Sequence, residues 1–196
     1  MHKTLIGVDE AGRGPLAGPV AVGVAMVPKE FDIRKAFPGV GDSKVLTEKK
    51  REEIYESALL YKDRGEINFC VEYASAKIID SVGITQAVRD CVHAGIRKLA
   101  PESIDVHVLL DGLLHAPEGY SQETIIKGDA TEPVISLASI VAKVSRDRLM
   151  KKMAEQFPKY GFEKHKGYGT KAHQEAIREF GLSEMHRKTF CRSLSF

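Results

Sequence analysis

The amino-acid sequence predicts an α/β fold in which a mixed β-sheet carries helices on its faces. Two apolar, strand-forming runs come first, at residues 4–9 and 19–27, and helices then alternate with strands along the chain. The turn that joins the first two strands is short and rich in glycine, so these strands are expected to pair antiparallel. Strands in sequence, followed by this alternation, predict a mixed sheet covered by helices.

The later elements follow from hydrophobic periodicity and from residues that cap helices. Thr47 can cap a helix over 48–62, and an apolar stripe predicts a helix over 84–99. Pro133 is tolerated in the first turn of a long helix over about 133–156. The remaining predicted elements are strands at 66–73, 105–111 and 123–129 and a helix at about 171–180.

Length and charge divide the chain into two parts. Its 196 residues suit one domain, which we divide into a core at 1–157 and a basic C-terminal helical extension at 158–196 packed on the same domain. Residues 1–142 carry 16 Lys or Arg against 21 Asp or Glu, a net charge of −5, whereas residues 143–196 carry 13 against 6, a net charge of +7. This asymmetry indicates that the basic segment binds a polyanion, although a solvated helical surface has the same composition.

Composition argues against a secreted or membrane protein. No apolar run reaches the roughly 18 residues that a membrane span requires, and no basic and apolar leader precedes the first strand. Cys70, Cys91 and Cys191 are odd in number and far apart, which fits a reducing compartment better than a disulfide framework. We therefore expect a cytoplasmic protein and, because no oligomerisation surface is evident, a monomer.

Acidic side chains end three of the predicted strands. Asp9 and Glu10 end the first strand, and Asp111 and Asp129 end two later ones. Functional groups of α/β sheets gather at the carboxyl ends of strands, so these acids converge if the three strands are neighbours. Successive strand residues point to opposite faces, so Asp9 and Glu10 can share a site only where the strand ends or twists. Taken singly, each acid also fits an ordinary turn or a helix cap.

Four carboxylates in a small volume require protons or divalent cations, because like charges raise one another's pKa. Oxygen ligands without His or Cys indicate Mg²⁺ or Mn²⁺ and argue against zinc. Two such ions would neutralise the formal charge of the cluster, and the matching chemistry is attack of metal-activated water on a phosphodiester. The acids therefore predict a metal-dependent site for phosphodiester hydrolysis.

The helix predicted at about 133–156 carries a polar stripe. Ser139, Lys143 and Arg146 fall on one side of this helix, opposite much of its apolar surface. Near a cluster of acids such a stripe could contact phosphates, although a solvent-exposed face shows the same pattern.

Several ordered blocks of sequence add a more specific signal than any single motif. These blocks are Asp9-Glu10-Ala11-Gly12-Arg13-Gly14-Pro15, Asp42-Ser43-Lys44, Asp111-Gly112, Lys127-Gly128-Asp129, Ala138-Ser139-Ile140-Val141-Ala142-Lys143-Val144, Arg146-Asp147, Tyr160-Gly161-Phe162 and His165-Lys166-Gly167-Tyr168-Gly169-Thr170. With them, the chain resembles ribonuclease HII, the type 2 ribonuclease H of bacteria, over essentially its whole length. The related ribonuclease HIII lacks this Gly-Arg-Gly and carries an extra N-terminal domain, so ribonuclease HII is the better match.

The resemblance implies a ribonuclease H-like fold, with a five-stranded mixed sheet flanked by helices and a C-terminal helical extension. It implies an endonuclease that cuts the RNA strand of RNA/DNA hybrids and cuts 5′ of single ribonucleotides embedded in duplex DNA. The products would carry 3′-hydroxyl and 5′-phosphate ends. The expected partners are these two kinds of duplex, and the expected cofactor is Mg²⁺ or Mn²⁺, with two ions present when substrate is bound.

The resemblance also assigns roles to residues. The catalytic and metal-binding acids of the family match Asp9, Glu10, Asp111 and Asp129. The loop that recognises the 2′-hydroxyl matches Gly12, Arg13 and Gly14, and the tyrosine that stacks on the sugar of the following deoxynucleotide matches Tyr168. The further residues expected to bind substrate are Lys44, Ser139, Lys143 and Arg146.

Two alternatives remain open at this point. Another metal-dependent nuclease of the same fold, such as a Holliday-junction resolvase or a 3′–5′ exonuclease, would use the four acids equally well. Such an enzyme would not need the Gly-Arg-Gly or Tyr168. A catalytically silent nucleic-acid-binding domain, in contrast, would not need the acids.

Overall fold

A computed structural model of the protein describes residues 2–192, and these residues form one five-stranded sheet in the order β3-β2-β1-β4-β5. Its strands are β1 (Thr4–Ala11), β2 (Val20–Pro28), β3 (Asn68–Ala74), β4 (Val106–Asp111) and β5 (Ser121–Ile125). β2 pairs antiparallel with both β1 and β3, whereas β4 pairs parallel with both β1 and β5. The sheet is therefore mixed, as predicted.

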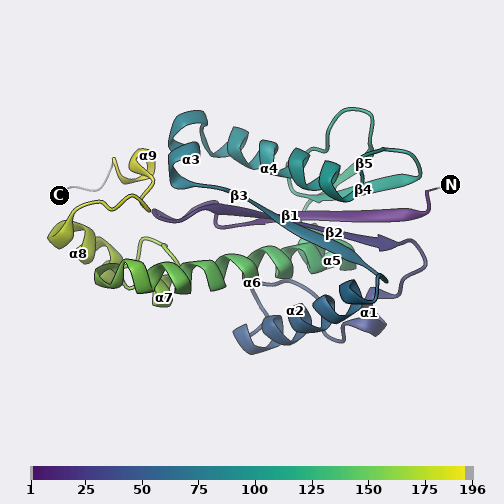
Figure 1. The fold of residues 1–196 in the computed structure, drawn as a ribbon, viewed down its shortest axis with the longest axis horizontal. Coiled ribbons are helices and arrows are strands. Elements are labelled where there is room, and N and C mark those ends of the chain that lie inside the picture. The colour runs from purple at the N-terminus through teal and green to yellow at the C-terminus, as the bar shows by residue number, and fades with distance from the viewer. Residues whose placement is uncertain (1, 193–196) are drawn as a thin grey trace.

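Helices cover both faces of this sheet (Figure 1). On one face lie α3 (Ala76–Val82) and α4 (Ile84–Leu99). On the other face lie α1 (Ile33–Ala36), α2 (Glu48–Asp63) and α6 (Pro133–Gln156), with α5 (Gly128–Thr131) before α6. The chain then continues through η1 (Pro158–Tyr160), α7 (Phe162–His165), α8 (Lys171–Phe180) and α9 (Lys188–Cys191). Within the described residues, no helix has both the length and the apolar character needed to cross a membrane.

Each face of the sheet buries its own apolar core. On the α4 face, Val8 of β1 packs in a cluster with Val92 of α4. On the α6 face, Ala25 of β2 packs in a second cluster with Leu137 of α6. Because alternate strand residues point to opposite faces, Val8 serves the α4 core, whereas its neighbour Asp9 faces α6.

Two glycines let α6 lie directly on the backbone of β1 and β2. A Cβ atom at Gly7 would overlap the carbonyl group of Val134, and one at Gly23 would overlap the carbonyl oxygen of Ala138. A strand glycine at such a position marks a close approach of another backbone. This contact brings the middle of α6 over the end of β1, where the acids lie.

The structure agrees with most of the predicted elements and differs at a few. The helices at 84–99, 133–156 and 171–180 have the predicted bounds. The last strand, however, ends at Ile125 rather than at Asp129, because Lys127 adopts a left-handed conformation with a φ of 57° and turns the chain into α5. α3 was not predicted, since seven residues are too few for a clear period, although Ser75 caps it by accepting from the N–H of Ile78.

Candidate active site

The four predicted acids gather at the carboxyl edge of three adjacent strands. β1 and β4 pair in parallel register up to the residues immediately before Asp9 and Asp111. Glu10 follows Asp9 within β1, whereas Asp129 comes from α5, shortly after the neighbouring strand β5. The backbone N–H of Asp129 donates to Asp111 Oδ1 at 3.3 Å, which ties α5 to the end of β4. The expected proximity of the three strands is therefore confirmed, although Asp129 reaches the edge from a short helix.

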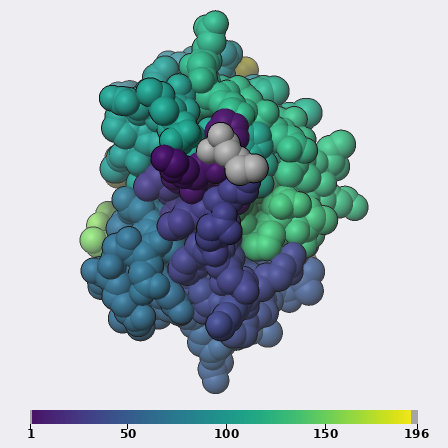
Figure 2. Space-filling model, turned by 90° about the vertical axis from the view of Figure 1, so that its right-hand side faces the viewer, coloured from purple at the N-terminus to yellow at the C-terminus, as the bar shows by residue number. Residues whose placement is uncertain are grey.

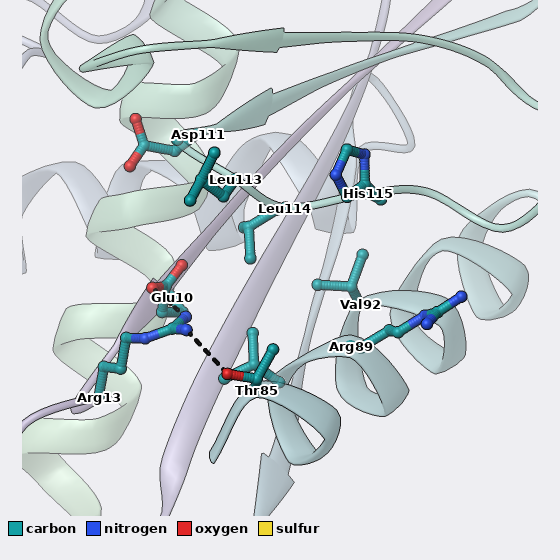
Figure 3. Close-up of a pocket in the computed structure, with 11 residues that line it drawn as sticks. Glu10, Arg13, Thr85, Arg89, Val92, Asp111, Leu113, Leu114 and His115 are labelled. Atoms are coloured by element: carbon teal, nitrogen blue, oxygen red, sulfur yellow. Dashed lines mark hydrogen bonds and ion pairs between the residues drawn. The ribbon is translucent and has the colours of Figure 1, made fainter. Parts of the chain in front are cut away.

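Asp9 and Glu10 point to opposite faces of the sheet, because β1 continues as a strand through Ala11. Asp9 is buried beneath α6, with 3% of its surface exposed. Glu10 faces α4 and lines a cavity together with Asp111 (Figure 3). The candidate site therefore spans the edge of the sheet and is not confined to one face.

The carboxyl group of Asp9 is buried, and one of its two oxygens lacks a hydrogen-bond donor among the described residues. Its Oδ1 accepts from the backbone N–H of Glu10 at 2.7 Å, whereas its Oδ2 has no hydrogen-bond partner among the described residues. Burial raises the pKa of Asp9 to about 8; the Ser139 hydroxyl opposes part of this shift, and the charges of Glu10 and Asp111 add to it. A bound cation would relieve both the orphaned oxygen and the electrostatic cost.

The other acids are partly neutralised by two basic side chains. Burial raises the pKa of Glu10, and Arg13 opposes this shift through an ion pair at 3.3 Å between Arg13 Nη1 and Glu10 Oε1. Burial likewise raises the pKa of Asp111. Lys44 Nζ donates to Asp129 Oδ2 at 2.9 Å, and this hydrogen bond raises the pKa of Lys44.

The side chains of the site fit a hard divalent cation, because the four acids offer carboxylate oxygens as ligands and no nitrogen or sulfur. In residues 2–192, no three His, Cys, Asp or Glu side chains are already grouped to hold a metal ion. The carboxylates instead stand at separate points along the edge. Mg²⁺ needs only one or two protein carboxylates when waters and substrate phosphates complete its shell, so such an arrangement suits an ion that binds with substrate.

The Gly12-Arg13-Gly14 loop leaves β1 directly after the acids. Gly12 has a φ of 85°, and a Cβ atom there would overlap the side chain of Arg146, so only glycine fits. A Cβ atom at Gly14 would meet no atom within 4 Å. The side chain of Arg13 also donates to Thr85 Oγ1 at 3.4 Å, which ties the loop to the first turn of α4. The loop therefore presents open backbone at Gly14 to a ligand beside the acids.

Arg187 holds this loop from behind. It is fully buried, and its guanidinium donates to the carbonyl oxygens of Gly12 at 2.6 Å, Arg13 at 2.8 Å and Gly18 at 3.0 Å. Burial lowers the pKa of Arg187 to about 9, which still leaves it charged at neutral pH. Sequence reasoning missed this residue, because an arginine in a basic segment carries no local signal that distinguishes a buried side chain from a solvated one.

The structure corrects the role expected for Arg146. Only 1% of its surface is exposed, and its guanidinium donates to the carbonyl oxygens of Pro19 at 2.8 Å and Ala17 at 3.2 Å. Lys143 is turned to Asp147 Oδ1 at 2.8 Å. The polar stripe of α6 is thus largely buried, because the helix is covered by the sheet on one side and by the loop before β2 on another. Arg146 supports that loop and is not available to a phosphate.

Ser139 lies inside the site and connects α6 to the segment that carries Lys44. It is 3% exposed, and its Oγ lies 2.7 Å from Ser43 Oγ in a hydrogen bond. This contact fixes the Asp42-Ser43-Lys44 turn beside Asp9. The side chain of Lys44 is 74% exposed while it reaches Asp129, so it can also meet a ligand from solvent.

Tyr168 lies on the loop between α7 and α8, with 45% of its surface exposed. The carbonyl oxygen of the preceding Gly167 accepts from the N–H groups of Leu16 at 2.9 Å and Ala17 at 3.3 Å. These hydrogen bonds join the tyrosine loop to the backbone that follows the Gly-Arg-Gly loop. Two segments far apart in sequence therefore form one continuous surface.

Comparison with known proteins agrees with this arrangement. The sequence model of the family described as ribonuclease HII matches residues 6–193. Ribonuclease HII from Bacillus cytotoxicus is 45% identical over 188 residues, which cover 95% of this chain and 68% of that protein. Ribonuclease HII from Endomicrobium trichonymphae is 45% identical over 186 residues, which cover 94% of this chain and 83% of that protein. A chain in the solved structure of the PCNA–ribonuclease HII complex from Archaeoglobus fulgidus has a TM-score of 0.75 at 27% identity, covering 94% of this chain and 93% of that chain.

Proposed function

Because the chain belongs to the ribonuclease HII family and is a hydrolytic ribonuclease, we propose that it is a metal-dependent endonuclease acting on two kinds of duplex. It cuts the RNA strand of RNA/DNA hybrids, and it cuts 5′ of single ribonucleotides embedded in duplex DNA. The products carry 3′-hydroxyl and 5′-phosphate ends. The observation that carries the proposal is that four acids lie along one sheet edge, beside a glycine loop whose backbone is open at Gly14.

The catalytic residues of this proposal are Asp9, Glu10, Asp111 and Asp129, which would hold two Mg²⁺ or Mn²⁺ ions when substrate is bound. Such ions supply a water activated for attack and neutralise charge on the phosphate. The free Oδ2 of Asp9 and the burial that raises the pKa values of Asp9, Glu10 and Asp111 support this assignment, because a bound cation would stabilise the charged form of each carboxyl group.

The chain's own residues would orient the substrate around these acids. Ser139 and Ser43 hold the Lys44 turn in place, and the exposed ammonium group of Lys44 would bind a phosphate oxygen next to Asp129. A phosphate contact of this kind fixes the register of a duplex and carries no sequence information. The Lys44 contact would therefore add no preference for base sequence.

Selectivity for ribose would come from the Gly12-Arg13-Gly14 loop and from Tyr168. The 2′-hydroxyl distinguishes RNA from DNA at a given nucleotide, and reading it requires close approach of hydrogen-bonding groups. The open backbone at Gly14 supports such an approach. The half-exposed ring of Tyr168 would pack on the next sugar, where a second 2′-hydroxyl would be crowded.

The proposal is tested by cleavage assays on three matched duplexes: an RNA/DNA hybrid, a DNA duplex with one ribonucleotide, and an all-DNA duplex. With Mg²⁺ or Mn²⁺, the wild-type protein should cut the first two, and chelation should stop it. Asp9→Asn should abolish cutting, whereas Asp63→Asn, an exposed acid at the end of α2, should not change it. Equal cutting of the all-DNA duplex would refute ribose selectivity, and turnover by Asp9→Asn would refute the assignment of the acids.

A further inference from the structure

A cavity extends from the acids along the α4 face of the sheet. It has a volume of about 630 Å³, within the range of about 300–1,000 Å³ that is usual for ligand pockets. Glu10 and Asp111 lie at one side of it, and Arg89 and His115 line it on the side away from them (Figure 3). The cavity is therefore larger than the catalytic edge and continues beyond it.

The floor of this cavity is apolar. Val88 and Val92 of α4 and Leu114 of the loop after β4 line it, and all three are buried. Leu113 stands at its lip with 91% of its surface exposed. Leu113 therefore extends the apolar lining from the buried floor to the solvent-exposed edge of the cavity.

The rim of the cavity opposite the acids is basic. Arg89 is exposed and forms no ion pair or side-chain hydrogen bond within residues 2–192. Arg13 closes the cavity near the acids, where it bridges Glu10 and Thr85. A ligand in this cavity would contact carboxylates at one end, an aliphatic surface in the middle and, at the other end, the guanidinium of Arg89, which pairs with no acid among the described residues.

This sequence of groups matches a nucleotide of the strand that is cut. A phosphate at the acids would place the adjoining sugar and base over an aliphatic surface, and the next phosphate in reach of a cation. Arginine is well suited to that contact, because its planar fork can donate two hydrogen bonds to one phosphate.

We propose that this cavity is a subsite for the nucleotide adjoining the cut bond, with its body on Val88, Val92 and Leu114 and its phosphate at Arg89. The subsite rests on the proposed function, since it takes the strand whose scissile phosphate lies at Glu10 and Asp111. Thr85 contributes to this subsite, because its Oγ1 accepts a hydrogen bond that positions Arg13 at the edge of the cavity near the acids.

The test compares Arg89→Ala with Arg97→Ala. Arg97 is an exposed arginine on the same helix, two turns further on and outside the cavity, so the two variants change the net charge equally. Loss of the phosphate contact should raise the KM for an RNA/DNA hybrid about 5- to 10-fold in Arg89→Ala and leave kcat within about twofold. Arg97→Ala should leave both constants unchanged, and Arg89→Lys should recover part of the loss.

Hybrids with a shortened cut strand show which phosphate contacts Arg89. In two further hybrids, the cut strand ends one nucleotide from the scissile phosphate, on the 5′ side in one and on the 3′ side in the other. The penalty of Arg89→Ala should disappear with one of them and persist with the other, which identifies the side that the cavity takes. A penalty that persists with both, or an equal loss in Arg97→Ala, would overturn the subsite and indicate general attraction to the polyanion.

A binding measurement keeps this inference separate from the cleavage proposal. Fluorescence anisotropy of the labelled hybrid in the presence of chelator should show the same 5- to 10-fold loss of affinity for Arg89→Ala and not for Arg97→Ala. If the wild type cleaves normally and the two variants bind the hybrid with equal affinity, the subsite is refuted and the proposed activity is not. If binding depends on Arg89 but the wild type cleaves neither kind of duplex, the proposed activity is refuted and the subsite is not.

Discussion

His173 Nε2 and His186 Nε2 lie 3.1 Å apart in a buried hydrogen bond, in which one imidazole donates and the other accepts. His186 Nδ1 accepts from the N–H of Ser183 at 2.9 Å, so its proton is on Nε2 and is donated to His173. His173 then has its own proton on Nδ1, which donates to the carbonyl oxygen of Tyr168 at 2.9 Å. These tautomers follow from the hydrogen-bond partners. A chain of neutral rings thus holds the loop that carries Tyr168.

Stability should fall in mild acid because of this pair. Burial lowers the pKa of His173 and of His186 to about 4. As the pH falls from about 6.5 to about 4, these histidines take up protons in the unfolded chain before they do so in the native state. The free energy of unfolding should therefore fall by about 2–4 kcal/mol across this window. Urea unfolding between pH 4.5 and 7.5 measures the loss. In His186→Asn the free energy of unfolding should depend less on pH, whereas His115→Asn, at an exposed position, should leave this dependence unchanged. An unchanged pH dependence in His186→Asn would contradict the explanation.

Asp9→Asn should stabilise the metal-free protein while removing activity. The pKa of Asp9 is raised from 3.8 to about 8, so the native state retains a proton that the unfolded chain releases, and stability falls as the pH rises through this window. At pH 7.5 without divalent ions, the variant should therefore gain about 2–4 kcal/mol over the wild type. Thermal unfolding in chelator measures the gain, and adding Mg²⁺ or Mn²⁺ should narrow it by stabilising the wild type alone. A variant less stable than wild type in chelator would show that Asp9 carries no buried electrostatic cost.

Arg187→Ala should disorder the Gly12 loop and weaken the fold. It would leave three buried carbonyl groups without donors, at a cost of about 2–4 kcal/mol. Cutting at a single embedded ribonucleotide should suffer more than cutting within a long RNA tract, because a single site offers only one 2′-hydroxyl for the loop to bind. Urea unfolding and the ratio of the two cleavage rates provide the measurements. Arg178→Ala, an exposed arginine on α8, serves as the control and should change neither.

The two loop glycines should respond differently to alanine. At Gly12 the φ of 85° and the overlap with Arg146 should cost about 1–3 kcal/mol of stability. At Gly14 a methyl group meets no protein atom, so stability should stay within about 0.5 kcal/mol. Cleavage should nevertheless fall in Gly14→Ala if this backbone approaches the ribose. Full activity of Gly14→Ala would argue that the ribose is read elsewhere on the loop.

The parts of the site that follow local patterns were predictable from sequence. The apolar periodicity of β1 and β4 located Asp9 and Asp111 at strand ends, and parallel pairing then brought them together. Hydrophobic periodicity predicts a strand that ends at Asp129, because the left-handed turn at Lys127 leaves no signal in that pattern. The periodic pattern also predicts a polar stripe on α6 that could contact phosphates or face solvent, whereas the fold buries Ser139 and Arg146 of this stripe.

The parts that depend on long-range burial were not predictable. Arg187 has no carboxylate beside it in sequence, and its partners are backbone carbonyl groups, which every residue has. His173 and His186 likewise gain their roles only when α8 and the loop before α9 meet. A sequence pattern reports which side chains are polar, but it does not report which polar side chains find partners inside the fold.

The hydrogen bond from Arg187 to Gly12 joins residues that are 175 positions apart. During translation, the loop leaves the ribosome long before the arginine that holds it, and contacts of such sequence separation close late in folding. Until then the carbonyl groups of the loop stay hydrated and its glycines sample many conformations. The nascent chain therefore carries Asp9 and Glu10 before the loop that follows them is ordered.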